Sequence, residues 1–181
     1  MDAANTYVAL LRGVNVGGKK KIAMAELRSL FSSLGFEDVV TYIQSGNVVF
    51  RGTDGDADEI SARIEREIAR VFGMDPAVLL RTPAELEKIV ERNPYRTHND
   101  PSELHLVFLN RTPAATAAAD LDPGRSPGDE FALHGREIYL YLPNGAGRSK
   151  LTIDYFERVL GARATQRNWN TLRKLLELSQ R

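Results

Sequence analysis

The sequence predicts an α+β fold built from two tandem ferredoxin-like halves with antiparallel sheets, followed by a C-terminal helix. Two observations carry this prediction. Short apolar runs typical of strands alternate with segments whose apolar residues recur at helical spacing, and the order strand, helix, strand, strand, helix, strand occurs twice in 181 residues. We expect the first half at 1–82, and the connecting helix, second half and last helix at 83–181. The repeat rests on element order alone, because the halves share little residue identity.

The first half contains four expected strands and two expected helices. Its first strand is the apolar run 7–11, which is too short for a helix and is followed by Arg12 and Gly13. The other expected elements are a helix with Leu27, Leu30, Phe31 and Leu34 on one stripe, a hairpin of strands 38–44 and 47–51 around Ser45-Gly46, a helix capped by Asp56 and ended by Gly73, and a strand at 77–81.

The second half repeats this order after a connecting helix. Thr82, Pro83 and Glu85 form the pattern of a capping box, which predicts a helix over 85–91. The elements expected after it are a strand at 104–109, an alanine-rich helix opened by Thr112-Pro113, a hairpin of 130–134 and 137–142, a helix at 149–160 capped by Ser149, a strand at 162–165 and a last helix at 168–179.

Composition excludes several classes of function. Lys plus Arg and Asp plus Glu both number 24, so net charge does not favour nucleic acid or an anionic membrane as a partner. The chain has no cysteine, which removes thiol nucleophiles, Cys-ligated zinc and disulfides. No signal peptide or membrane-spanning run is visible at the sequence level. We therefore expect a cytoplasmic protein without a membrane partner, with a monomer favoured.

The most patterned stretch is a basic, glycine-rich segment between the first strand and the first helix. Glycines let backbone N–H groups approach an anion closely, and a helix N-terminus adds its dipole. The segment begins like a phosphate-binding P-loop, but Lys20 stands where such a loop needs Ser or Thr for magnesium, so we expect no NTPase. The candidate ligand-binding residues here are Arg12, Gly13, Asn15, Gly17, Gly18, Lys19, Lys20 and Lys21.

Three further polar segments lie at turns or helix starts. Their candidate ligand-binding residues are Gln44, Ser45 and Asn47 in the first hairpin, Arg148, Ser149 and Lys150 in a second basic loop at 145–150, and Arg167 and Asn168 before the last helix. The amides near the last helix can cap it or contact a ligand, and both interpretations stay open. No base is placed by sequence to activate Ser149 as a nucleophile. The three histidines lack metal-ligand spacing, so we expect no metal and no cofactor.

Several of these motifs together resemble an uncharacterised bacterial family, domain of unknown function 1697. The segments that carry the resemblance are 11–18 (LRGVNVGG), 41–50 (TYIQSGNVVF), 93–95 (NPY), 135–139 (GREIY) and 167–171 (RNWNT). The resemblance implies no activity, cofactor or catalytic residue. Because the best-matching motifs are polar or glycine-rich segments in loops and turns, it favours a ligand site over a purely structural domain.

The sequence favours binding of a phosphate-bearing ligand, either a nucleotide or a nucleic acid, by the loops at 12–21 and 145–150. Nucleic acid is included because Tyr42, Phe50, Tyr139 and Tyr141 lie on hairpin strands, where rings can stack on bases, although such rings are more often part of the core. An enzyme acting on a small molecule in a polar cleft is an alternative, but it has no evident base. A structural or partner-binding protein is another.

Overall fold

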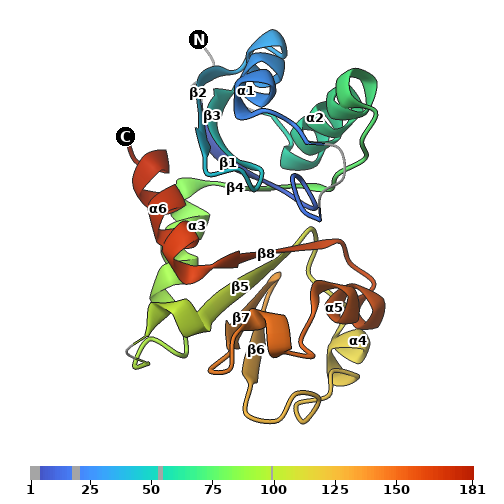
Figure 1. Ribbon diagram of the computed structural model, residues 1–181, viewed down its shortest axis with the longest axis vertical. Helices are drawn as coiled ribbons and strands as arrows, with labels where there is room; N and C mark the ends of the chain where they lie inside the picture. Colours follow the sequence, from blue (N-terminus) through green and yellow to red (C-terminus); the bar gives the residue numbers. More distant parts are fainter. Residues whose placement is uncertain (1–4, 18–20, 53–54, 99) are drawn as a thin grey trace. The chain divides into compact units, whose positions relative to one another are not determined.

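The computed structural model describes residues 5–17, 21–52, 55–98 and 100–181 and divides the chain into two compact units. The first unit comprises residues 1–87 and 175–181, and the second comprises residues 88–174. The chain passes between them twice, inside helix α3 (Pro83–Glu91) and inside helix α6 (Trp169–Ser179). Each unit has one four-stranded antiparallel sheet with helices, which confirms the predicted α+β class (Figure 1).

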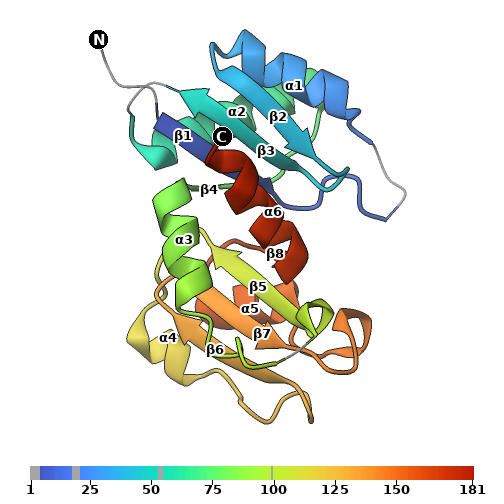
Figure 2. The same cartoon turned by 90° about the vertical axis from the view of Figure 1, so that its left-hand side faces the viewer.

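The first unit has the predicted order of strands and helices. Its elements are β1 (Asn5–Leu11), α1 (Met24–Ser33), β2 (Glu37–Tyr42), β3 (Asn47–Gly52), α2 (Ala57–Phe72) and β4 (Val78–Arg81). The sheet order is β2-β3-β1-β4, and β1 pairs antiparallel with both β3 and β4. Both helices lie against one face of this sheet (Figure 2).

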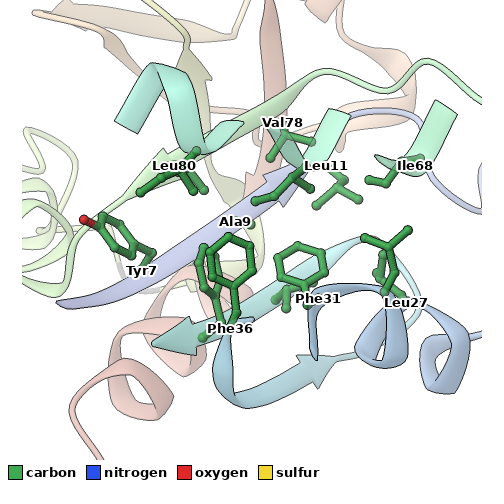
Figure 3. Packing of buried hydrophobic residues seen from close by; sticks show 14 of the residues in the cluster. Tyr7, Ala9, Leu11, Leu27, Phe31, Phe36, Ile68, Val78 and Leu80 are labelled. Carbon is green, nitrogen blue, oxygen red and sulfur yellow. The ribbon is translucent and has the colours of Figure 1, made fainter. Parts of the chain in front are cut away.

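The core of the first unit lies between the sheet and these two helices. Alternate residues of β1, including Tyr7, Ala9 and Leu11, point into this core (Figure 3). The Tyr7 ring stacks on the Phe50 ring, with ring centroids 5.6 Å apart. Phe50 of β3 is fully buried there, with its ring centroid 5.2 Å from that of Phe31 and 4.5 Å from that of Phe36. The period-two alternation of the strand and the helical spacing of α1 therefore bury the same apolar cluster.

Helix ends in the first unit follow the predicted caps. The Asp56 side chain accepts a hydrogen bond from the Asp58 backbone N–H at the start of α2, and Gly73 ends the helix in the left-handed conformation, with φ 62°. At α3, the Thr82 N–H donates to the Glu85 carboxylate at 2.8 Å, and the Glu85 N–H donates to Thr82 Oγ1 at 3.3 Å. The predicted capping box is confirmed.

The second unit repeats the architecture. Its elements are the short 3₁₀ turn η1 (Pro101–Glu103), β5 (Leu104–Leu109), α4 (Ala115–Ala119), β6 (Glu130–His134), β7 (Glu137–Tyr141), a second 3₁₀ turn η2 (Ala146–Arg148), α5 (Ile153–Leu160) and β8 (Ala164–Asn168). The sheet order is β6-β7-β5-β8, the same pattern as in the first unit. Its core contains Val107, Ile138 and Phe156, which are fully buried.

Three expected boundaries in the second unit were wrong. Thr152, not Ser149, caps α5, because its Oγ1 accepts from the Tyr155 N–H at 3.2 Å. Helix α4 begins only at Ala115, since Ala114 is still extended, with φ −62° and ψ 145°. Strand β8 runs on to Asn168 because its pairing with β5 continues to His105, so the strand includes residues that the sequence assigned to a turn and a helix start.

The two sheets also match in detail. In the first unit, Leu11 of β1 pairs with Val78 of β4, and three residues along the same ladder Val8 pairs with Arg81. In the second unit, Leu109 of β5 pairs with Ala164 of β8, and three residues along Leu106 pairs with Arg167. Arg81 and Arg167 are both buried, and each Nη1 donates to the carbonyl oxygen of the preceding residue, at 2.9 Å and 2.8 Å. The duplication therefore extends from element order to individual side chains.

Candidate functional site

The glycine-rich segment forms a loop in which left-handed residues alternate with ordinary ones. Gly13, Asn15 and Gly17 have φ of 72°, 59° and 73°. Between them Val14 is buried in the core of the first unit, and Val16 is 67% exposed. The alternation turns successive side chains inward and outward. The candidate residues Gly18, Lys19 and Lys20 lie outside the described residues.

Asn15 holds this loop in place with its side chain. Its Oδ1 accepts from the Ile22 N–H at 2.8 Å, and its Nδ2 donates to the Ile22 carbonyl at 2.9 Å, so one amide closes the loop across seven residues. The same Nδ2 donates to the Gln44 carbonyl at 3.0 Å, in the turn between β2 and β3. Asn15 is therefore a positioning residue that joins two of the predicted motifs, and its amide is occupied by backbone groups.

The β2–β3 turn is pressed against the start of the same loop. The Leu11 N–H donates to the Gly46 carbonyl at 2.9 Å. A Cβ on Gly46, which has φ 75°, would lie 2.8 Å from Leu11 Cβ and 3.2 Å from Val14 Cβ, so only glycine fits. Ile43 in this turn also has a positive φ, 48°, which is rare for a β-branched residue.

Asn47 gives the β2–β3 turn its internal support. It is fully buried, and its Nδ2 donates to the Tyr42 carbonyl at 3.1 Å and to Ser45 Oγ at 2.9 Å. The Gln44 side chain is exposed and Ser45 is half-buried. Of the three candidates in this turn, Asn47 therefore shapes the backbone, and Gln44 and Ser45 lie at the surface near Asn15.

Positive charge and a helix N-terminus complete the site. Arg12 is half-buried, its backbone N–H donates to the Ala77 carbonyl at 2.9 Å, and Lys21 is exposed. Helix α1 begins after Ala23, whose side chain cannot accept a hydrogen bond. The Ala23 side chain therefore does not compete with an anion for the first backbone N–H groups of the helix. The exposed Glu26 in the first turn places one carboxylate at this end. Taken together, these groups suit an anion.

The second basic loop lies in the second unit and is held by its own neighbours. Arg148 and Lys150 are exposed, and Ser149 Oγ accepts from the Leu151 N–H at 3.0 Å in a local turn. The Lys150 N–H donates to Ser126 Oγ at 3.1 Å, and Arg125 Nε donates to the Lys150 carbonyl at 2.8 Å. Ser149 thus has a structural role, while both cations remain at the surface.

The two candidates before the last helix have structural contacts. Arg167 is buried inside β8, where its Nη1 donates to Thr165 Oγ1 at 2.7 Å, and burial lowers its pKa to about 10. Asn168 Oδ1 accepts from the Thr171 N–H at 2.8 Å and so caps α6. Sequence reasoning missed the equivalent arginine, Arg81. The available signal was a lone arginine closing the apolar strand 78–81.

The aromatic side chains considered for base stacking are mostly internal. Phe50 and Tyr139 are buried, and the Tyr139 hydroxyl donates to the Ile89 carbonyl at 2.8 Å. Tyr141 is half-buried and already stacks on His98, with ring centroids 3.9 Å apart. Burial raises the pKa of Tyr95 and of Tyr139 to about 12, with a smaller contribution from Glu130 at Tyr95.

Hollows in the first unit lie along α1. One, of about 460 Å³, lies between α1 and α2 and is lined by Leu30, Glu67 and Val71 among others, while another, of about 600 Å³, lies beside β2. Neither is lined by a predicted ligand-binding residue. No cluster of metal-ligating side chains occurs among the described residues. In the same part of the chain, no helix is long and apolar enough to cross a membrane.

The fold and the site define a class of protein: two repeated α+β units, the first with a clamped glycine-rich loop. The chain belongs to the DUF1697 family of proteins of unknown function, whose model matches residues 4–139. Its structure is similar to that of conserved bacterial protein SP0830 from Streptococcus pneumoniae, with 25% sequence identity, a TM-score of 0.77 and coverage of 98% of this chain and 99% of that one. A comparison with curated proteins found no match.

Proposed function

We propose that the first unit binds an anionic, phosphate-bearing ligand at the loop pair, which we define as residues 12–22 and 43–46. One observation carries this proposal: the two units share their strand order and the pairing of β1 with β4 and of β5 with β8, but they differ in the connections that follow β1 and β2 and their counterparts. Residues 12–23 connect β1 to α1, while only 110–114 connect β5 to α4. The hairpin connection likewise spans 43–46 in the first unit and only 135–136 in the second. The first unit therefore carries added backbone that its fold does not require.

The chemistry of the loop pair supports an anion as its ligand. Alternation of left-handed and ordinary residues is a backbone arrangement in which neighbouring N–H groups can bind one anion, and the N-terminus of α1 adds a positive dipole. Arg12 and Lys21 contribute charge, together with Lys19 and Lys20 from the sequence. Asn15 would join the two segments and Asn47 would shape the β2–β3 turn, both without touching the ligand, because their amides already bind groups of the protein.

Among phosphate-bearing ligands, we propose nucleotides and nucleic acids. Each unit has the element order and sheet order of a ferredoxin-like fold, an architecture that can bind nucleic acid. The buried rings of Phe50 and Tyr139 are not available for base stacking, so phosphate contacts would dominate. Arg148 and Lys150 are proposed as a separate anion contact of the second unit.

The test is a titration of labelled oligonucleotide and of ATP at several salt concentrations. We expect binding that weakens with salt, and a triple variant, Lys19→Ala, Lys20→Ala and Lys21→Ala, that binds oligonucleotide more weakly with a flatter dependence of log affinity on log salt. The matched control removes three exposed arginines elsewhere, by Arg66→Ala, Arg96→Ala and Arg173→Ala. Equal losses in both triple variants, or no binding to either ligand at low salt, would contradict the proposal.

A further inference from the structure

The sheet of the second unit ends on a regular edge strand, β6. In the order β6-β7-β5-β8 this strand has β7 as its single neighbour. All five residues pair without a register shift, from Glu130 opposite Tyr141 to His134 opposite Glu137. Within the described part of the chain, no hydrogen bond from outside the sheet reaches residues 130–134. A regular edge of this kind is a template for another strand.

The equivalent edge of the first unit is protected. Strand β2 has a register shift between Glu37 and Val40, and Asp38 has a positive φ of 49°. Asp38 also forms an ion pair with Arg51 at 2.9 Å. Bulges and charges are the devices that keep an edge strand from pairing with another chain. Of these two equivalent edges, β2 thus carries a register shift and β6 keeps a regular ladder.

The hairpin geometry fixes which groups of β6 point outward. A two-residue turn, Gly135-Arg136, connects β6 to β7, so the closing pair of His134 and Glu137 is hydrogen-bonded. Hydrogen-bonded and non-hydrogen-bonded pairs alternate along an antiparallel ladder. Phe131 and Leu133 therefore direct their N–H and C=O groups away from β7, toward the open edge.

We propose that β6 pairs antiparallel with β6 of a second copy of this chain, about a two-fold axis at Ala132. In this register Phe131 lies opposite the partner's Leu133, and Leu133 lies opposite the partner's Phe131. Every residue with outward N–H and C=O groups then meets another such residue, and the two pairs exchange four hydrogen bonds. An antiparallel strand pair of identical chains is self-complementary, as a two-fold interface requires.

Side chains in this register complement one another. Glu130 lies opposite the partner's His134, and the two-fold axis repeats this contact. Each His134 imidazole then has two carboxylates as cross-strand neighbours, Glu137 of its own chain and the partner's Glu130. At the axis two alanine side chains meet, which allows close approach. Phe131 and Leu133 pack on the core but are only partly buried, so pairing covers their remaining apolar surface. Strand β6 shares no residue with the loop pair, and the proposal departs from the monomer that the sequence favoured.

The experiment measures mass against concentration by sedimentation equilibrium on the full chain. We expect a concentration-dependent dimer for the wild-type protein. Ala132→Lys places two like charges directly opposite at the axis and should abolish the dimer. Glu130→Lys and His134→Glu should each weaken it about tenfold, because the first removes the carboxylate that faces the partner's His134 and the second sets two carboxylates opposite each other. In an equimolar mixture of these two variants, the introduced lysine of one chain lies opposite the introduced glutamate of the other and the second contact keeps its original histidine and glutamate, so the dimer should recover.

Two controls separate this interface from a folding defect or another surface. Circular dichroism of each variant checks that the sheet is retained, and recovery in the mixture cannot come from two misfolded chains. Val40→Lys, on the exposed part of the β2 edge, should leave the dimer unchanged. A wild-type chain that stays monomeric up to millimolar concentration would overturn the proposal. So would a folded Ala132→Lys variant that dimerises normally, or a Val40→Lys variant that does not dimerise.

Discussion

Gly46 and Gly17 have similar backbone angles but very different surroundings. Both have positive φ, yet a Cβ would meet nothing within 4 Å at Gly17 and would collide with Leu11 at Gly46. We predict that Gly17→Ala costs about 1 kcal/mol of unfolding free energy from backbone strain, and that Gly46→Ala costs about 2–4 kcal/mol. Urea denaturation of the two variants measures this difference. Equal losses would show that the β2–β3 turn can move away from the loop.

Ionisation of the buried Tyr139 phenol links the stability of the fold to alkaline pH. Burial raises its pKa to about 12 from an ordinary value of 10.0, so the folded state favours the neutral phenol. The associated stability is complete below pH 10 and is lost as the pH rises through about 12. In an absorbance titration of the six tyrosines, we predict late ionisation of Tyr95 and Tyr139. Tyr139→Phe should remove one late step, and a titration unchanged in Tyr139→Phe would contradict the assignment.

Asn15 shows why the site could be only partly predicted from sequence. The glycine-rich pattern and the following helix indicated a loop with anion-binding geometry. The role of Asn15 depends on its bond to Gln44, which is 29 residues away, and no local pattern reports such a contact. The sequence therefore placed Asn15 among the ligand-binding residues, whereas its side chain is used to join two segments of backbone.

At the scale of elements, helix α6 is capped by a residue that was also a ligand candidate. Asn168 Oδ1 accepts the Thr171 N–H, and Thr152 Oγ1 caps α5 in the same way. We predict that Asn168→Ala and Thr152→Ala each cost about 1 kcal/mol in urea denaturation. Neither change should alter oligonucleotide or ATP binding. If Asn168→Ala weakened binding but left the free energy of unfolding unchanged, Asn168 would again be a candidate ligand contact.

Element boundaries were predictable where local chemistry decides them and not where pairing does. Thr82 and Glu85 specify a helix start by themselves, and that prediction is confirmed. Ser149 and Thr152 are both good caps, so the sequence alone could not choose between them. Strand β8 contains Arg167 and Asn168, whose polarity suggested a helix start, and only the pairing with β5 shows that the strand continues.

At the scale of the whole molecule, the first unit is built from two separate stretches of chain, residues 1–87 and 175–181. Leu175 is 1% exposed, and Gln180 donates to the Glu87 carboxylate at 2.5 Å within this unit. We predict that Leu175→Ala costs about 2–4 kcal/mol and accelerates amide exchange chiefly in β1 to β4. Leu160→Ala, in the core of the second unit, is the matched control and should accelerate exchange chiefly in β5 to β8. The same exchange pattern in both variants would indicate a single cooperative unit.

The path of the chain also sets an order for folding during synthesis. Residues 88–174 form one uninterrupted stretch, so a ribosome releases the whole second unit before it releases residues 175–181. The four strands of the first sheet leave the ribosome first, but the side chains of residues 175–181 that complete this unit are synthesised last. During that interval the nascent first unit is incomplete while the second can already close its core. The half that is translated first is therefore expected to be the half that is finished last.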